Sequence, residues 1–302
     1  MHTQNLLNNN LPRRAFLGAF ALPAFGANRI DRSRVSAITD EIARTPAAAI
    51  EFAHQYGLKW LELRSVPGEK REYFILPEAE LNQAAKEFRD GGVRISFLNT
   101  SMLKFYLPDT TPANPRVRPD PARYHRRKEE LRQAIGAAHI LGTDKVRIFT
   151  FMRADKPEQH YPRIAEVINE LAEVAARDKI QLLIENEGAC NVRTSAELVA
   201  LLKMIPSKWV GINWDPHNAD RGGEVPFPDG YNLLPARRIH NVQIKGRSIL
   251  DFPERMDWAA VFKRLEKDGY RDQVGLETHI FGDVQIQKSH ESMQAILKVV
   301  GA

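Results

Sequence analysis

Eight short apolar runs, most of them followed by a helical segment, constrain the fold of this chain more than any other feature. The predicted strands occupy residues 35–40, 59–64, 93–99, 145–151, 180–185, 210–215, 240–245 and 273–277. The predicted helices occupy residues 46–57, 77–92, 121–141, 158–178, 194–205, 256–268 and 287–299. Short apolar strands that alternate with helices are typical of a parallel sheet covered on both faces.

Eight strand–helix units between residues 28 and 302 predict a single (β/α)₈ TIM barrel in the α/β class. An open doubly wound sheet is the alternative, although no glycine-rich dinucleotide fingerprint or P-loop follows any strand. The helix after the sixth strand is the hardest to see, and residues 230–238 predict one turn only. The segment 194–205 begins with a capping box formed by Thr194 and Glu197.

The composition is that of an ordinary globular protein, with 43% hydrophobic and 27% charged residues in a chain of 302. The formal net charge is +5, and because residues 1–27 hold two arginines and no acid, +3 remains for the rest. This mild, dispersed charge argues against a nucleic acid partner. The single cysteine, Cys190, excludes an intramolecular disulfide and is expected to be a buried thiol. No run reaches the roughly 18 apolar residues of a spanning helix, so we expect no stable membrane anchor.

The first 27 residues differ in kind from the rest of the chain. The stretch "NNNLPRRAFLGAFALPAFGA" contains the pair Arg13 and Arg14, a short apolar run and then small residues. This pattern resembles a twin-arginine export signal with cleavage near Ala27. A chance arginine pair in an N-terminal tail is the alternative. Because such signals export folded proteins, the pattern predicts a periplasmic or exported protein, and we expect the barrel domain to occupy residues 28–302.

Polar side chains gather where the predicted strands end. In a parallel barrel, catalytic side chains come from the C-terminal ends of the strands. In chain order, the candidates are Asp40, Glu41, Glu62, Arg64, Asn99, Lys104, Arg147, Glu185, Glu187, Asp215, His217, His240, Gln243, Lys245, Glu277 and His279.

Three acids, Glu185, Asp215 and Glu277, take equivalent places at the ends of strands five, six and eight. Carboxylates that converge on one mouth repel each other, and desolvation adds to the cost. A divalent cation would resolve this conflict, with Mn²⁺, Mg²⁺, Co²⁺ or Zn²⁺ as candidates. Asp215 has an alternative role as a helix cap or turn residue before Pro216. His240 comes early in strand seven, and a structural role is expected for it.

These strand ends resemble the xylose-isomerase-like TIM-barrel family, which groups sugar isomerases and epimerases with the apurinic endonucleases. The resemblance covers nearly the whole chain after the N-terminal segment. The most specific matches are "LLIENEGACNVRTSAEL" and "GINWDPHNA", supported by "AITDEI", "KWLELRSV", "TSMLK", "VRIFTF", "IHNVQIKGR" and "VGLETHIFG".

The resemblance implies one divalent cation, Mn²⁺ before the other candidates, held by Glu185, Asp215, position 243 and Glu277. The family often has His-x-Lys-Asp at position 243, whereas this chain has Gln243, Ile244, Lys245 and Gly246. An amide oxygen is a weaker ligand than imidazole, and His217 could compensate by binding metal or substrate. In this interpretation Glu185 and Glu277 act as base and acid, with Lys104 and His217 as further catalytic candidates. Substrate-binding candidates are Glu62, Arg64, Arg147, Lys245 and His279.

The function that this resemblance implies is a metal-dependent sugar isomerase or epimerase that acts through an enediolate. Without a phosphate-cradling loop, and with predicted export, a free sugar or an oxidised glycoside is favoured over a sugar phosphate. A lyase or dehydratase on an inosose or a 3-keto-glycoside is the alternative reaction at the same site. A non-catalytic sugar-binding barrel and an apurinic endonuclease are further alternatives. A homodimer is one expected assembly, although no motif shows how copies would pair.

Overall fold

The computed structural model describes residues 29–114, 116, 118–251 and 255–301. The predicted export signal lies outside the described residues. Eight parallel strands form one sheet in the order β1-β8-β7-β6-β5-β4-β3-β2. They are β1 (Val35–Ala37), β2 (Trp60–Leu63), β3 (Arg94–Leu98), β4 (Lys145–Ile148), β5 (Gln181–Glu185), β6 (Val210–Trp214), β7 (Ile239–Lys245) and β8 (Val274–Glu277).

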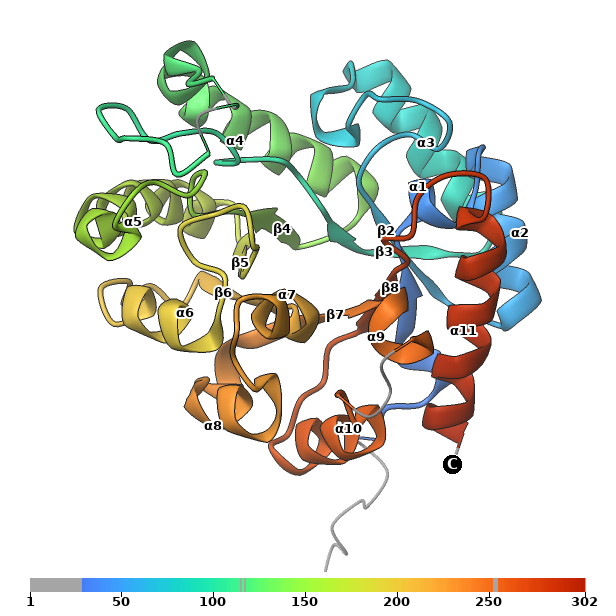
Figure 1. The fold of residues 1–302 in the computed structure, drawn as a ribbon. Coiled ribbons are helices and arrows are strands. Elements are labelled where there is room, and N and C mark those ends of the chain that lie inside the picture. Colours follow the sequence, from blue (N-terminus) through green and yellow to red (C-terminus); the bar gives the residue numbers. More distant parts are fainter. Residues whose placement is uncertain (1–28, 115, 117, 252–254, 302) are drawn as a thin grey trace, which may run out of the picture.

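The two ends of this sheet meet, so the strands enclose a nearly closed barrel. Strands β1 and β2 are joined by one parallel bridge, between Ile38 and Glu62. Figure 1 shows the strands at the centre of a ring of helices, which is the arrangement of a TIM barrel. The predicted fold class is therefore confirmed, and the open doubly wound sheet is excluded.

Among the described residues, seven longer helices form the outer ring: α2 (Pro46–Tyr56), α3 (Glu78–Asp90), α4 (Pro121–Leu141), α5 (Tyr161–Arg177), α6 (Ser195–Leu202), α10 (Trp258–Lys267) and α11 (Gln285–Gly301). Four short helices lie in the segments that follow strands: α1 (Thr39–Ile42), α7 (Pro216–Arg221), α8 (Tyr231–Leu233) and α9 (Gly246–Leu250). No helix within the described ranges is long and apolar enough to cross a membrane.

Local sequence signals fix several helix ends. Thr45 and Asp120 cap the first turns of α2 and α4, and both helices end at a glycine with positive φ, Gly57 at 63° and Gly142 at 77°. The capping box of α6 forms as predicted from Thr194. These caps satisfy backbone groups that a helix end leaves without partners.

Strands β1 and β4 are each three residues shorter than expected, and the expected single turn in the segment 230–238 is present. Strand β1 stops at Ala37 instead of residue 40, because residues 39–42 wind into α1, whose first turn carries two acids, as helix N-termini favour. Strand β4 stops at Ile148 instead of residue 151, and Phe151 has a φ of 60°, which a strand does not accommodate. After β6, the chain forms the six-residue α7, a five-residue π turn, Pro226–Gly230, and then the one-turn α8, which lies in the segment 230–238 where one turn was expected.

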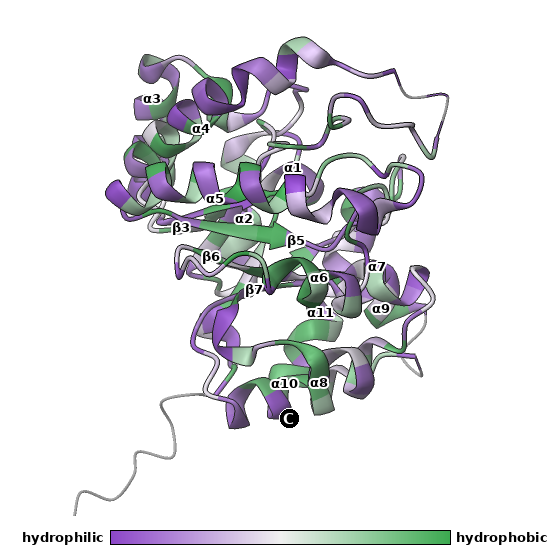
Figure 2. Ribbon diagram, turned by 90° about the vertical axis from the view of Figure 1, so that its left-hand side faces the viewer, coloured by the Kyte–Doolittle hydropathy of each residue, from purple (hydrophilic) through white to green (hydrophobic). Residues whose placement is uncertain are grey.

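The sheet is apolar toward the helices and polar toward the barrel axis. Figure 2 shows β5 as hydrophobic between helices of mixed hydropathy. Inside the barrel, Asn241 donates to Asn213 at 3.0 Å, and Asn213 donates to Glu185 at 2.7 Å. These three residues are register partners on β7, β6 and β5, so their side chains form a polar row across the inner face of the sheet that ends at Glu185.

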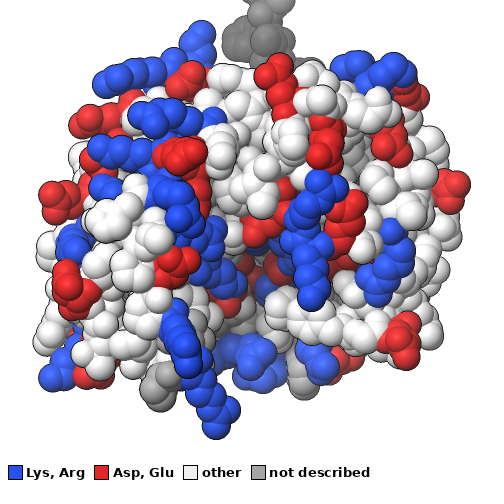
Figure 3. All heavy atoms as spheres, turned by 90° about the horizontal axis from the view of Figure 1, so that it is seen from above, with Lys and Arg blue, Asp and Glu red and all other residues white. Residues whose placement is uncertain are grey.

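Lys and Arg are interspersed with Asp and Glu on the face shown in Figure 3.

Cys190 is fully buried, as expected, and its backbone forms an antiparallel bridge with Met152, which links the loops after β5 and β4.

Candidate active site at the mouth of the barrel

Three buried carboxylates meet at the C-terminal mouth of the barrel. Glu185 ends β5, Asp215 directly follows β6, and Glu277 ends β8. One oxygen of each lies within 4.8 Å of the others. The structure thus brings together the three acids that the sequence placed at equivalent strand ends, because parallel strands end at one rim.

Asp215 uses its two oxygens differently. Its Oδ1 accepts a hydrogen bond from the backbone N–H of Asn218 at 2.9 Å and caps α7. Its Oδ2 lies 3.1 Å from the ammonium of Lys245. The alternative role of helix cap is therefore confirmed for one oxygen, and the other remains directed to the site.

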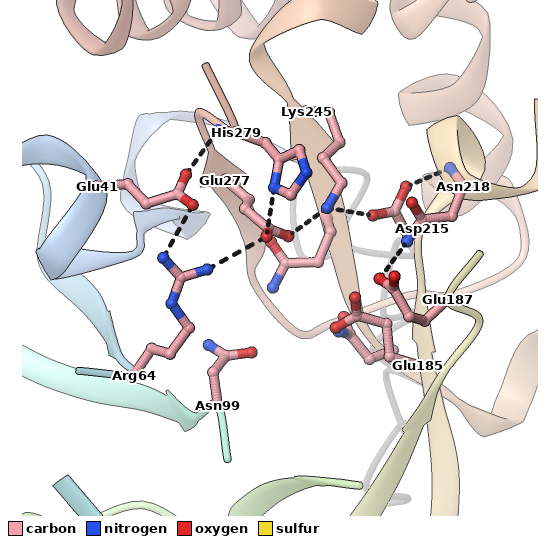
Figure 4. Close-up of polar contacts among 12 residues, drawn as sticks. Glu41, Arg64, Asn99, Glu185, Glu187, Asp215, Asn218, Lys245, Glu277 and His279 are labelled. Atoms are coloured by element: carbon pink, nitrogen blue, oxygen red, sulfur yellow. Dashed lines mark hydrogen bonds and ion pairs between the residues drawn. The ribbon is translucent and has the colours of Figure 1, made fainter. Parts of the chain in front are cut away.

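Lys245 lies at the centre of this cluster (Figure 4). Its Nζ is 3.1 Å from Asp215 and 2.9 Å from Glu277, and only 2% of its side chain is exposed. Burial lowers the pKa of Lys245, but the surrounding carboxylates outweigh it and hold the pKa above its usual value. The side chain is therefore an ammonium ion. Burial, together with the charges of Glu185 and Glu277, outweighs the effect of this ammonium and raises the pKa of Asp215 to about 7.

Glu185 and Glu277 have contrasting surroundings. Glu185 accepts from Arg147 at 3.0 Å and from Asn213 at 2.7 Å, yet burial raises its pKa above the usual value. Burial acts in the same direction on Glu277, but Lys245, His279 and Arg64 together hold the pKa of Glu277 well below its usual range. Arg64 and His279 both lie 3.4 Å from Glu277. Two carboxyl groups whose pKa values are pushed apart are suited to opposite roles in proton transfer.

Gln243 and Glu62 form a layer beneath the three carboxylates. Glu62 is fully buried and accepts hydrogen bonds from Ser36 at 2.7 Å, Asn99 at 2.9 Å and Gln243 at 2.8 Å. Burial raises the pKa of Glu62 above its usual value. The amide nitrogen of Gln243 is thus committed to Glu62, and its oxygen is left for other partners.

The donor set fits a divalent cation. The oxygens Gln243 Oε1, Asp215 Oδ2 and Glu277 Oε2 are buried and accept no hydrogen bond from the part of the chain that the structure describes. Carboxylate and amide oxygens are ligands that Mg²⁺ and Mn²⁺ accept, and Zn²⁺ also binds carboxylates. A buried oxygen that accepts no hydrogen bond has lone pairs available to a cation. Within the described residues, Lys245 is the cation that contacts two of these oxygens.

Two adjoining hollows open on this cluster. The smaller, of about 220 Å³, is lined by both Glu185 and Glu277 and by Lys104, whose ammonium lies 4.5 Å from the centre of the Phe149 ring. The larger, of about 420 Å³, is lined by Lys245, His217, Arg247 and Phe281. His279 borders both hollows.

The remaining predicted residues lie at the margins of these hollows. Lys104 is 3.7 Å from Glu187, and Arg147 borders the smaller hollow. His217 borders the larger hollow from α7, and burial together with Lys245 lowers its pKa to about 4, so it is neutral at pH 7. His240 lies elsewhere, with Nδ1 3.0 Å from Asp272, in the structural role expected for it.

Sequence reasoning missed several polar residues that organise the mouth. Asn186 accepts from the backbone N–H of Asp215 at 2.8 Å, and its amide nitrogen donates to the Asp215 carbonyl at 2.7 Å. Asn213 anchors Glu185, and its place two residues before Asp215 on the same strand face could have revealed it. Glu41, by contrast, was among the strand-end candidates named from the sequence; it accepts from Arg64 at 2.9 Å and from the backbone N–H of His279 at 2.7 Å, which ties α1 to the segment after β8.

Solved structures with the same fold include several sugar-modifying enzymes. The 3-keto-D-glucoside 4-epimerase YcjR from E. coli shares 10% identity and a TM-score of 0.69, covering 89% of this chain and 100% of its own. The D-allulose 3-epimerase from Methylomonas sp., solved with D-allulose, shares 16% identity and a TM-score of 0.66, covering 90% and 96%. The IolI protein, solved with a zinc atom, shares 16% identity and a TM-score of 0.67, covering 88% and 96%.

No curated protein matches the sequence. The family model described as xylose isomerase-like TIM barrel matches residues 50–298, from α2 to α11, and this range includes all three clustered carboxylates. The chain therefore belongs to the xylose isomerase-like TIM-barrel family.

Proposed function

We propose that this protein is a divalent-metal-dependent sugar isomerase or epimerase that moves a proton next to a carbonyl group. The observation that carries the proposal is the convergence of Glu185, Asp215 and Glu277 within 4.8 Å at the barrel mouth. The sugar epimerases among the structural neighbours support a small carbohydrate as substrate. When bound, a divalent cation would polarise the substrate carbonyl and a neighbouring hydroxyl, which favours an enediolate.

Glu185 and Glu277 are the proposed acid and base. Glu277 is held ionised by its cationic neighbours, so it is in the unprotonated form that a base requires. Burial raises the pKa of Glu185, which suits it to hold a proton and return it from the other side. Asn213 and Arg147 both donate hydrogen bonds to the Glu185 carboxylate, so that its orientation does not depend on the substrate.

The small hollow accounts for the proposed sugar contacts. Lys104, Arg64 and Arg147 present cationic donors around its 220 Å³, and sugar hydroxyls accept such hydrogen bonds. Glu62 and Gln243 lie in the layer below the three carboxylates, where the hydrogen bond between them stabilises the floor of the site. The larger hollow adjoins the site through His279 and leaves room for a second part of a substrate, such as the aglycone of an oxidised glycoside.

The first test is the metal content of the purified protein, followed by proton exchange at carbon. Keto-sugars and 3-keto-glycosides are incubated in D₂O with Mn²⁺, and the carbon-bound proton next to the carbonyl is followed by NMR. We expect exchange in the wild type and its loss in Glu185→Gln. The exposed residue Glu173 on α5 supplies a control variant, Glu173→Gln, that should exchange like the wild type.

Product analysis distinguishes the alternatives. An isomerase or epimerase returns a sugar of the same mass, whereas a lyase or dehydratase releases an aglycone or water. Sugar binding that persists in both wild type and Glu185→Gln, without exchange in either, would contradict an enzymatic role and favour a binding barrel.

We also propose export by the twin-arginine pathway, on the basis of Arg13 and Arg14. Residues 1–27 are fused to a reporter that is active only outside the cytoplasm. We expect activity with the natural pair and its loss when both arginines are replaced by lysine.

A further inference from the structure

The buried ammonium of Lys245 lies between two of the three clustered carboxylates. Lys245 ends β7, and its register partner on β8 is Glu277. Its Nζ lies 2.9 Å from Glu277 Oε2 and 3.1 Å from Asp215 Oδ2 (Figure 4). A buried ammonium without partners is very costly, so these two contacts are what keep the side chain inside the protein.

The same two oxygens are those that a divalent cation would use. Neither Asp215 Oδ2 nor Glu277 Oε2 accepts a hydrogen bond within the described ranges, and the Lys245 ammonium forms an ion pair with both. A cation bound by both oxygens would lie close to the present position of Nζ. Two positive charges at such a distance in a buried site repel strongly, so both cannot occupy this position.

The surroundings offer the ammonium another place. Lys245 borders the larger hollow of about 420 Å³, next to His217 and Thr278. Gln243, two residues earlier on the same strand face, already donates its amide nitrogen to Glu62 and keeps its oxygen free of hydrogen bonds from the described residues. Strand β7 therefore places a possible metal ligand, the oxygen of Gln243, close to a competing cation, the ammonium of Lys245.

We propose that Lys245 is an internal cation that competes with the divalent ion for Asp215 and Glu277. In the metal-free protein, the ammonium holds the two carboxylates together and preserves the shape of the site. Binding of the ion requires the lysine to turn out toward the larger hollow, where its ammonium becomes available to a substrate oxygen. This inference rests on the proposed function, since it assumes that the cluster is a metal site.

The test measures metal binding without reference to turnover. Mn²⁺ is titrated into metal-stripped wild type and Lys245→Met by calorimetry, and free Mn²⁺ is followed by electron paramagnetic resonance. We expect Lys245→Met to bind at least ten times more tightly. We also expect the metal-free variant to melt at a lower temperature than the metal-free wild type, because its carboxylates lose their cation. Arg247→Met is the matched control, because it removes a half-exposed cation from the same hollow without freeing the carboxylates, and we expect Mn²⁺ affinity within about threefold of wild type.

Each outcome separates this inference from the proposed function. Equal or weaker binding by Lys245→Met, with a wild type that binds Mn²⁺, would overturn the inference and leave the metal site standing. Binding by Lys245→Met but not by the wild type would support the competition and contradict metal dependence of the natural protein. Binding by neither would overturn both. If Lys245→Met does not fold, Lys245→Gln is used, since its amide can still donate to the carboxylates.

Discussion

A methyl group added at Gly275 would collide with the carboxylate that forms the floor of the site. Gly275 on β8 pairs in register with Ser36 and Gln243, and the Glu62 side chain fills the space beside it. A Cβ built on Gly275 would lie 1.8 Å from Glu62 Oε1 and 3.0 Å from Ser36 Oγ. Side chains do not approach a Cβ within about 3 Å, so Glu62 would have to retreat by more than about 1 Å.

The size of the effect follows from what Glu62 would lose. Overpacking a buried site costs about 1–3 kcal/mol. The three hydrogen bonds that Glu62 accepts from Ser36, Asn99 and Gln243 would each weaken, at about 1 kcal/mol for a bond that is broken. We therefore expect Gly275→Ala to lower the free energy of unfolding by about 3–5 kcal/mol. The melting temperature should fall by roughly 10 °C.

Urea unfolding followed by circular dichroism measures this change. Shortening the colliding side chain should relieve it, so Gly275→Ala combined with Glu62→Asp is expected to cost less than the sum of the two single changes. A Gly275→Ala protein within about 1 kcal/mol of the wild type would refute the reasoning, because it would mean that Glu62 is not packed against β8.

Three further predictions concern stability away from this contact. Gly136→Ala in α4 meets no atom within 4 Å and should raise the free energy of unfolding by about 0.5–1 kcal/mol, in contrast to Gly275→Ala, and the same urea assay checks it. Arg147→Met leaves the buried carboxylate of Glu185 without its ion-pair partner and should cost about 3–5 kcal/mol, whereas an unchanged urea midpoint would show that the pair contributes little. Burial raises the pKa of Asp272, but a hydrogen bond with His240 and the ammonium of Lys145 outweigh it and lower the pKa below the usual value. The stabilisation by Asp272 is therefore complete above about pH 4 and lost as the pH falls below it, so Asp272→Asn should cost about 1–3 kcal/mol at pH 7, and unfolding measured from pH 7 to 2 should show the difference from wild type shrinking.

The fold was predictable because each unit carries its own local signals. Helix α4 occupies the expected residues 121–141, and the cap at Thr194 forms as predicted. The predicted strand ends are wrong at Asp40 and Phe151, because the backbone leaves the strand earlier there and turns into the mouth of the barrel. There the tertiary requirement to direct side chains toward the barrel axis overrides strand propensity.

The candidate site was predictable as a set of residues but not as a geometry. Strand ends and the family resemblance placed Glu185, Asp215 and Glu277 together. The sequence also pointed to Lys245 and Gln243, but only as a substrate-binding residue and a metal ligand. No spacing rule reveals that a lysine would reach between two carboxylates, or that the Gln243 amide would turn its nitrogen to Glu62, since both depend on contacts among different strands.

The buried thiol of Cys190 allows the opening of the loops around it to be measured by chemical labelling. It is the only thiol in the chain, and its backbone bridges Met152 between the loops after β5 and β4. A thiol reagent can reach it only when these loops part, so the labelling rate measures how often the rim beside Glu185 opens. Mn²⁺ or a bound sugar that holds the rim closed would slow this labelling, and no engineered probe is needed to follow it.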